Sequence, residues 1–319
     1  MQLRLPRILV RVQGSSVVCS YYATFNLEHD MTTQTNVKSL ASSAMLVSLN
    51  ISLWTARKLD KKVSNDVDIS NSTMTKAGNY HKNLLAGDDS LAAIGKVAGV
   101  IRTYHMTQTS PWNDNGDRLL TTAQFFIYKK EMARLEQQYW DLVSTFIAGY
   151  STRISAAAFQ LGSLFNRDEY PDVEQVTGKF GFVVRYTPVP EVGDWRVDIG
   201  NEGLKEVQEQ YALMYEANIE KVHADAYDRL YKILTQLSFG LRTNEDGSKG
   251  KVFDSVLDNT KELCGLLSSF NIKGDTQLEA MRIKLEDSFT GIDAQDIKKS
   301  DYIRITLKRD VDSMLDKWN

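Results

Sequence analysis

The chain has 319 residues, of which 42% are hydrophobic and 25% are charged, and these proportions exclude a largely disordered protein. Its formal net charge of −3 excludes a global positive field, so contact with nucleic acid or an anionic membrane would need a local basic patch. The two cysteines, Cys19 and Cys264, indicate no disulfide framework and favour a reducing compartment. No window approaches the roughly 18 uninterrupted apolar residues of a membrane span, so we predict no transmembrane helix.

Residues 1–30 combine basic and apolar residues, but their longest apolar stretch, Ile8 to Val10, is too short for a signal-peptide core. Met31 opens a polar stretch, TTQTNVKS, that is typical of the start of a mature protein. We therefore expect residues 1–30 to be upstream sequence translated from a misassigned start codon, with a flexible amino-terminal arm as the alternative. In both cases we predict that the segment is dispensable and that residues 31–319 form a single domain.

The stretch MLVSLNISLWTARKLDKKVSNDV, residues 45–67, changes character halfway. Apolar and polar residues alternate over 46–53, which predicts a half-buried strand containing Ile51. After Trp54 the basic residues fall three and four apart, so over 55–76 we predict a helix with a cationic face, followed by a polar linker. The residues of this basic run are Arg57, Lys58, Lys61 and Lys62.

Helical spacing dominates most of the remaining chain. A helix is predicted from Leu91 to Ile101, after a turn at 87–90, and the segment TSPWNDNGDRLL, residues 109–120, is predicted to be a loop. Two long amphipathic helices are predicted, one over 119–165 and one from Leu204 to Leu237 that ends at Gly240, and we expect them to pair as an antiparallel hairpin. The apolar stripe of the second contains Leu204, Val207, Tyr211, Met214, Val222, Leu230, Ile233 and Leu237. Shorter helices are predicted at 251–270, 276–290 and 311–318.

A β-hairpin insertion is predicted at about 178–200, between the two long helices. Its strands are 180–187 and 195–199, and a further alternating segment, 302–308, is predicted to be a strand. Since a lone hairpin is marginally stable, we expect these segments and 46–53 to share one small antiparallel sheet. In that arrangement, substituting Ile51 or Ile305 by aspartate would place an unpaired charge in an apolar face of the sheet. The predicted fold class is α+β and mainly α-helical.

Catalytic and metal-binding motifs are missing from the sequence. It contains no GxxxxGK[ST], GxSxG, HExxH or CxxC. Its histidines lack metal-ligand spacing and are predicted to be surface or capping residues: His29, His81, His105 and His223. The acidic pairs Asp114/Asp117 and Asp168/Glu169 flank turns, where such residues commonly cap. We therefore predict no catalytic residue, metal or cofactor.

The basic run is the best candidate for a polar binding surface. With Trp54, and with aromatic and basic residues of the predicted strands, it could offer single-stranded nucleic acid cations and stacking groups. Against this, Asp60 and Asp66 interleave the run, and a solvated helix or an intersubunit contact explains it equally well. The candidate nucleic-acid or partner-binding residues are Trp54, Arg57, Lys58, Lys61, Lys62, Arg185 and Arg196.

Four blocks together resemble an uncharacterised family of tailed-phage and prophage proteins: LNISLWTARKLDKKVSNDV, SPWNDNGDRLL, LGSLFNRDEYPDVEQVTGKFGF and TPVPEVGDWRVDIG. The resemblance implies a phage protein made in the cytoplasm of an infected bacterium. Some relatives are encoded near MoxR-like AAA+ ATPases and von Willebrand A-type proteins, which implies a helical adaptor for such machinery. No functional residues carry over from this family.

Our leading hypothesis is a non-enzymatic phage interaction or adaptor protein that acts through long amphipathic helices. It would self-associate or bind another phage protein, with an AAA+ ATPase as one candidate partner. The alternative is a single-stranded nucleic-acid-binding protein of phage replication or recombination that uses the basic run.

Overall fold

The computed structural model describes residues 40–190 and 201–318, which belong to the unit Lys38–Asn319. Residues 1–30, Arg196 and the predicted strand at 195–199 lie outside the described residues. The strands are β1 (Ala44–Ser52), β2 (Arg57–Leu59), β3 (His81–Asn83), β4 (Ser110–Pro111), β5 (Arg118–Thr121) and β6 (Gly181–Pro188). The α-helices are α1 (Leu40–Ser43), α2 (Lys61–Ser70), α3 (Ser90–Gln108), α4 (Phe125–Ala148), α5 (Tyr150–Leu161), α6 (Val173–Thr177), α7 (Asn201–Leu241), α8 (Asp254–Phe270), α9 (Thr276–Phe289), α10 (Ala294–Lys299) and α11 (Asp301–Leu315). Short 3-10 helices are η1 (Gly162–Leu164), η2 (Arg167–Glu169) and η3 (Asp316–Trp318).

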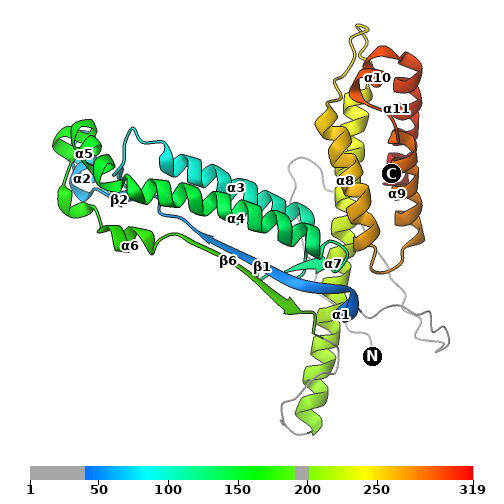
Figure 1. Cartoon of the computed structure of the whole chain (residues 1–319), viewed down its shortest axis with the longest axis horizontal. Coiled ribbons are helices and arrows are strands. Elements are labelled where there is room, and N and C mark those ends of the chain that lie inside the picture. Colours follow the sequence, from blue (N-terminus) through cyan, green and yellow to red (C-terminus); the bar gives the residue numbers. More distant parts are fainter. Residues whose placement is uncertain (1–39, 191–200, 319) are drawn as a thin grey trace. The chain divides into compact units, whose positions relative to one another are not determined.

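A small antiparallel sheet has the strand order β4-β5-β1-β6 (Figure 1). Leu46 of β1 lies opposite Leu119 of β5 on one side and Thr187 of β6 on the other. This pairing confirms that 46–53 and 180–187 are strands of one sheet, and the mainly helical α+β class is likewise confirmed. A two-stranded sheet, β2-β3, is separate from it.

Strands β4 and β5 arise from the segment that was predicted to be a loop. The side-chain oxygen Oδ1 of Asn113 accepts hydrogen bonds from the backbone N–H groups of Asn115 and Asp117, at 3.0 and 3.1 Å. Gly116 supplies a φ of +93°, which a residue with a side chain rarely adopts. The resulting turn reverses the chain, so that β5 can continue onto the edge of β1.

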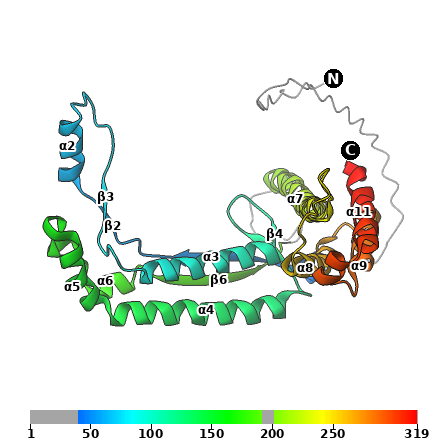
Figure 2. The same ribbon diagram turned by 90° about the horizontal axis from the view of Figure 1, so that it is seen from above.

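One face of the β1–β6 pair is covered by α3 and α4, which lie side by side (Figures 1 and 2). Val47 and Ile51, four residues apart along β1 and therefore on the same face of the strand, are buried there. The helices contribute residues three or four apart, among them Ile94, Ala98 and Ile101 of α3 and Leu135, Tyr139, Val143 and Phe146 of α4. This layer is the largest apolar core of the described chain.

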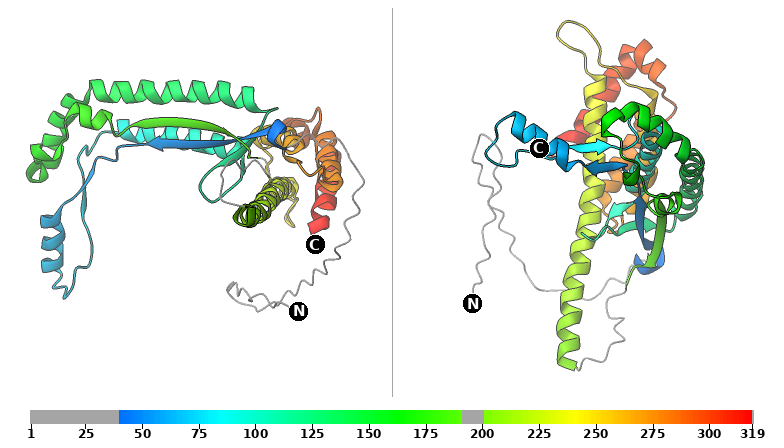
Figure 3. Two further views of the ribbon diagram at one scale, coloured as in Figure 1. Left: turned by 90° about the horizontal axis from the view of Figure 1, so that it is seen from below. Right: turned by 90° about the vertical axis from the view of Figure 1, so that its left-hand side faces the viewer.

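Helix α7 takes part in two further apolar clusters. At 41 residues it is about 60 Å long, and Figure 3 shows it as one continuous helix. Val222 packs with Ala44, Leu46 and Trp112 beside the sheet. Farther along, residues from Ala226 to Leu241 pack with α8, α9 and α11. The long helix predicted from Leu204 is therefore confirmed.

The predicted strand at 302–308 is wrong, because this segment is the first half of helix α11. Its short alternation competes with a longer helical stripe of partly or fully buried residues, Ile303, Leu307, Val311 and Met314. Burial of that stripe against α7, α9 and α10 favours the helix. Ile305 is 67% exposed, so the apolar sheet face expected around it does not exist.

The predicted helix over 119–165 is divided. It contains β5, α4 and α5, and Gly149 ends α4 by donating its N–H to the carbonyls of Thr145 and Ile147. The predicted pairing of two long helices is also corrected: α4 pairs with α3 in an antiparallel hairpin, while α7 packs against α8 and α11. Helices close to the predicted 251–270 and 276–290 are present as α8 and α9.

Candidate functional site

We predicted that the basic run lies on one helix, and this prediction is wrong because the run is divided between a strand and a helix. Arg57 and Lys58 belong to β2, whereas Lys61 and Lys62 begin α2. Asp60 separates them because its carboxylate caps α2, accepting a hydrogen bond from the Val63 N–H at 3.1 Å. The chain therefore turns from strand to helix within the run. We call residues 57–83, which contain β2, α2 and β3, the basic module (Figure 2).

Lys82 anchors the basic module from β3. Its side chain is 4% exposed, and its Nζ lies 2.6 Å from Oε2 of Glu169 and 3.4 Å from Oδ2 of Asp60. It also donates a hydrogen bond to the carbonyl of Leu164 at 2.6 Å. Burial opposes the charged form, but the hydrogen bond to Glu169 and the nearby carboxylates raise the pKa of Lys82 above its ordinary value. Lys82 is thus a buried cation that ties β3 to the η1–η2 segment.

The four predicted cations remain available on the surface of the module. Arg57, Lys58, Lys61 and Lys62 are all exposed, and none forms an ion pair with another residue that the structure describes. Residues 57–83 contain six lysine or arginine residues and three aspartates, a net charge of +3. This local charge is opposite in sign to the −3 of the whole chain.

Two other predicted site residues do not join these cations. Trp54 is partly buried, with its ring centroid 6.1 Å from that of Phe146 and 5.7 Å from that of Tyr150. Its ring therefore belongs to the core and is not a free stacking platform. Arg185 is exposed on β6 opposite Ser48, in the larger sheet, whereas the basic module has its own two-stranded sheet.

The basic module also exposes apolar side chains that the sequence did not single out. Val67, Ile69, Met74 and Tyr80 are all exposed. Ile69 and Met74 line a cavity of about 470 Å³ together with Lys61 and Lys76. Asp68 also lines it, and its carboxylate accepts a hydrogen bond from the Ala77 N–H. Exposed apolar side chains and lysines of the module thus line the same cavity, which we call the hollow of the module.

A second exposed apolar surface lies in the first half of α7. Leu213 is 73% exposed and Met214, a residue of the predicted apolar stripe, is 52% exposed. We call residues 205–217 the α7 surface. It carries one lysine and three glutamates, a net charge of −2. Glu209 and Glu216 lie four residues before and three residues after Leu213, which places them beside it on the helix.

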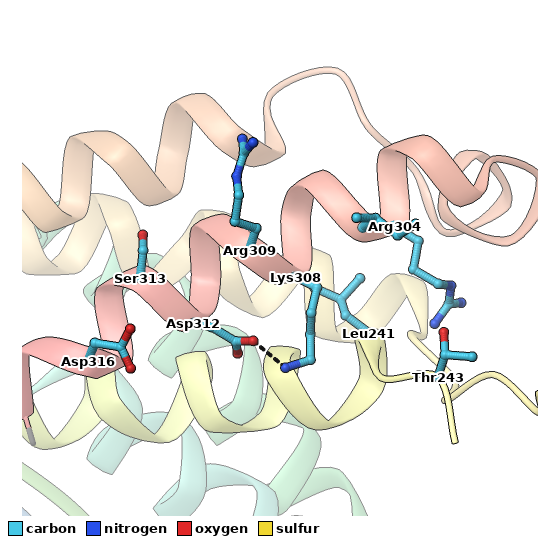
Figure 4. Close-up of a pocket in the computed structure, with 9 residues that line it drawn as sticks. Leu241, Thr243, Arg304, Lys308, Arg309, Asp312, Ser313 and Asp316 are labelled. Carbon is cyan, nitrogen blue, oxygen red and sulfur yellow. Dashed lines mark hydrogen bonds and ion pairs between the residues drawn. The ribbon is translucent and has the colours of Figure 1, made fainter. Parts of the chain in front are cut away.

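A cavity of about 500 Å³ lies between α11 and the end of α7, and Figure 4 shows its lining. Arg304 is 4% exposed and donates hydrogen bonds from Nη1 to the carbonyls of Gly240, at 3.1 Å, and Gly250, at 3.2 Å. Gly240 belongs to the last turn of α7, where a cation stabilises the negative end of the helix dipole. Lys308 pairs with Asp312, and Arg309 points away from that pair. The polar groups of this cavity thus hold the end of α7.

An arginine also joins α7 to the end of α3. Arg229 of α7 donates to the carbonyls of Met106, at 3.0 Å, and Thr109, at 2.6 Å, and forms an ion pair with Asp225 at 2.8 Å. His105, predicted to be a surface or capping residue, is buried with its Nδ1 2.8 Å from the hydroxyl of Tyr128. Burial and, secondarily, the charge of Arg118 lower the pKa of His105 to about 4. This polar cluster is a structural joint between helices.

The two acidic pairs Asp114/Asp117 and Asp168/Glu169 each contribute one residue to an ion pair. Asp114 forms an ion pair with Lys221 at 3.0 Å, and Glu169 pairs with Lys82. Among residues 40–190 and 201–318, no group of three or more His, Cys, Asp or Glu side chains is arranged to hold a metal ion. Within the same ranges, no helix has both the length and the apolar composition needed to cross a membrane.

Comparisons with protein-family models, with curated proteins and with solved structures find no match to this chain. Among the residues that the structure describes, the basic module and the α7 surface are two candidate binding surfaces, because each combines exposed apolar side chains with a net local charge.

Proposed function

We propose that the chain is a non-enzymatic phage interaction protein, acting in the cytoplasm of the infected bacterium, that binds another protein through the α7 surface. The exposure of Leu213 and Met214 on a long helix carries this proposal. Burying such a side chain contributes about 1.5–3 kcal/mol, so covering both would supply a substantial part of a specific contact. The resemblance of four sequence blocks to phage proteins supports the biological setting and makes an AAA+ ATPase one candidate partner.

The α7 surface is suited to helix-mediated recognition. Leu213 and Met214 stand among glutamates, so a partner needs an apolar groove with basic residues at its rim. A helix of this length also presents its side chains from a rigid backbone, which limits the conformational entropy lost on binding.

The test is an affinity capture from bacteria producing the phage, with the tagged chain as bait. A Leu213→Ser, Met214→Ser variant should lose the specific partner, because its apolar contact area is removed. A Tyr302→Ser, Ile305→Ser variant is the matched control, since both of these residues are exposed on α11, at 80% and 67%. Equal recovery of every captured protein by the wild-type and α7 variants would contradict the proposal.

A second candidate function, single-stranded nucleic-acid binding, is favoured by the four exposed cations of the basic run, which form no ion pair with another described residue. It is placed second because Trp54 packs in the core, which leaves Tyr80 as the exposed aromatic residue of the module. Fluorescence anisotropy with a labelled single strand tests it. Binding through the module should weaken steeply with salt and disappear in a Lys58→Glu, Lys61→Glu, Lys62→Glu variant.

A further inference from the structure

We infer that the partner of the α7 surface is a second copy of this chain, and that the α7 surface of one copy docks on the basic module of the next. This inference rests on the proposed function and names its partner. It follows from the charge and the apolar side chains of the two surfaces.

The two surfaces are complementary in charge. The basic module carries a net charge of +3 and the α7 surface a net charge of −2. Lys61 and Lys76 are exposed at the hollow of the module, and Glu209 and Glu216 are exposed on α7. Opposite charges of this kind accelerate encounter and set the register of the contact, while two copies of the same surface would repel.

The apolar side chains also match. Ile69 and Met74 line the cavity of about 470 Å³, with Lys61 and Lys76 beside them. Leu213 has the reciprocal arrangement, an apolar side chain with Glu209 and Glu216 on either side along the helix. Seating Leu213 in the hollow would cover the apolar groups of both surfaces and bring each glutamate close to a lysine.

The contact joins two different surfaces of one chain, so it is heterologous. After one contact, one copy keeps its basic module unused and the other keeps its α7 surface unused, so the contact repeats until a ring closes or an open chain grows. We therefore expect assemblies larger than dimers, whose size increases with protein concentration and decreases with salt.

Sedimentation analysis of the full chain with charge reversals tests the inference. A Lys58→Glu, Lys61→Glu, Lys76→Glu variant should weaken association by roughly 100-fold or more, because it places like charges opposite each other. A Glu206→Lys, Glu209→Lys, Glu216→Lys variant should do the same. A chain carrying all six substitutions should regain association to within about tenfold of the wild type, since the charges are exchanged.

Mixing the two triple variants gives an independent readout. Two contacts are then compatible in charge: the reversed module of one variant with the reversed α7 surface of the other, and the native α7 surface of the first with the native module of the second. Neither variant should assemble alone, whereas the mixture should regain assembly with the two variants alternating at a 1:1 ratio. A Lys130→Glu, Lys232→Glu, Lys261→Glu variant is the matched control, because these lysines are exposed on α4, α7 and α8. It should assemble like the wild type.

Three results would overturn the inference. They are a wild-type chain that stays monomeric at every concentration and salt tested, a sixfold variant that does not regain association, and a module reversal that abolishes single-strand binding without changing the oligomeric state. None of them decides the proposed function, which depends on whether the Leu213→Ser, Met214→Ser variant loses its partner in the capture experiment.

Discussion

Replacing Lys82 by methionine tests how the basic module is held to the rest of the chain. The substitution keeps an unbranched side chain of similar length and removes the charge. It leaves the Glu169 carboxylate, 15% exposed, without the Nζ at 2.6 Å, and it leaves the Leu164 carbonyl without its donor. The consequence should be local opening of β2, α2 and β3.

The size of the effect follows from the burial of the pair. Removing one partner of a buried ion pair costs about 3–5 kcal/mol, because the other charge stays in place without compensation. Since Glu169 keeps some contact with solvent, we expect the lower end, about 3 kcal/mol. That loss corresponds to an increase on the order of 100-fold in the equilibrium constant for local opening, to which the hydrogen-exchange rate is proportional when the segment recloses faster than it exchanges.

Hydrogen exchange followed by mass spectrometry measures this opening directly. Peptides covering residues 57–83 should exchange on the order of 100-fold faster in Lys82→Met, while peptides of α8 and α9 should be unchanged. A Lys82→Met, Glu169→Gln variant is the control, and it should recover most of the protection because no carboxylate remains buried at that position without its partner. Unchanged exchange in Lys82→Met would refute the structural role assigned to this lysine.

Three further predictions concern stability, measured by urea unfolding. Arg304→Met should destabilise the chain by about 2–4 kcal/mol, because the Gly240 and Gly250 carbonyls lose a charged donor. Lys308→Met breaks only the half-exposed ion pair with Asp312 and should cost under about 1 kcal/mol. Ile51→Asp should cost several kcal/mol and Ile305→Asp under about 0.5 kcal/mol, since only Ile51 is buried; equal losses would contradict the assignment of α11. The neutral form of His105 stabilises the fold above pH 6.5, and this contribution is lost as the pH falls toward 4; relative to His105→Gln, wild-type stability should fall over this range by up to about 3 kcal/mol.

The elements that could be predicted are those whose apolar residues follow a single spacing, either that of a strand or that of a helix. Alternation over 46–53 identified β1, and the long stripe beginning at Leu204 identified α7. The alternation over 302–308 is nearly as long as that over 46–53, but the same residues also belong to a helical stripe through Leu307 and Val311, and packing against α7 and α9 selects the helix. Strands β4 and β5 are short, at two and four residues, and β5 depends on β1 for its pairing, so their own residues carry little signal.

The candidate surfaces were predictable only in part. The exposed cations of the basic run could be predicted, because a run of basic residues rarely lies in a core. The burial of Lys82 could not, since it depends on Glu169 and Leu164, which are more than 80 residues away in the sequence and which only the fold brings near. Similarly, Met214 belongs to the predicted apolar stripe of the long helix and Leu213 is its neighbour in the sequence, and only the tertiary structure shows that both are exposed.

The position of β1 in the sheet has a consequence for synthesis of the chain. Ile51 pairs with Phe182, which the ribosome adds about 130 residues later, roughly 7–26 s at the usual rates of elongation. During that interval the edge of β1 that β6 will occupy has no partner, and this is the kind of edge to which nascent chains on neighbouring ribosomes can add a strand. By contrast, α8, α9 and α11 lie close together in the sequence and form their contacts soon after they emerge. The interval between the two strands is therefore the period in which a chaperone would protect the growing chain most.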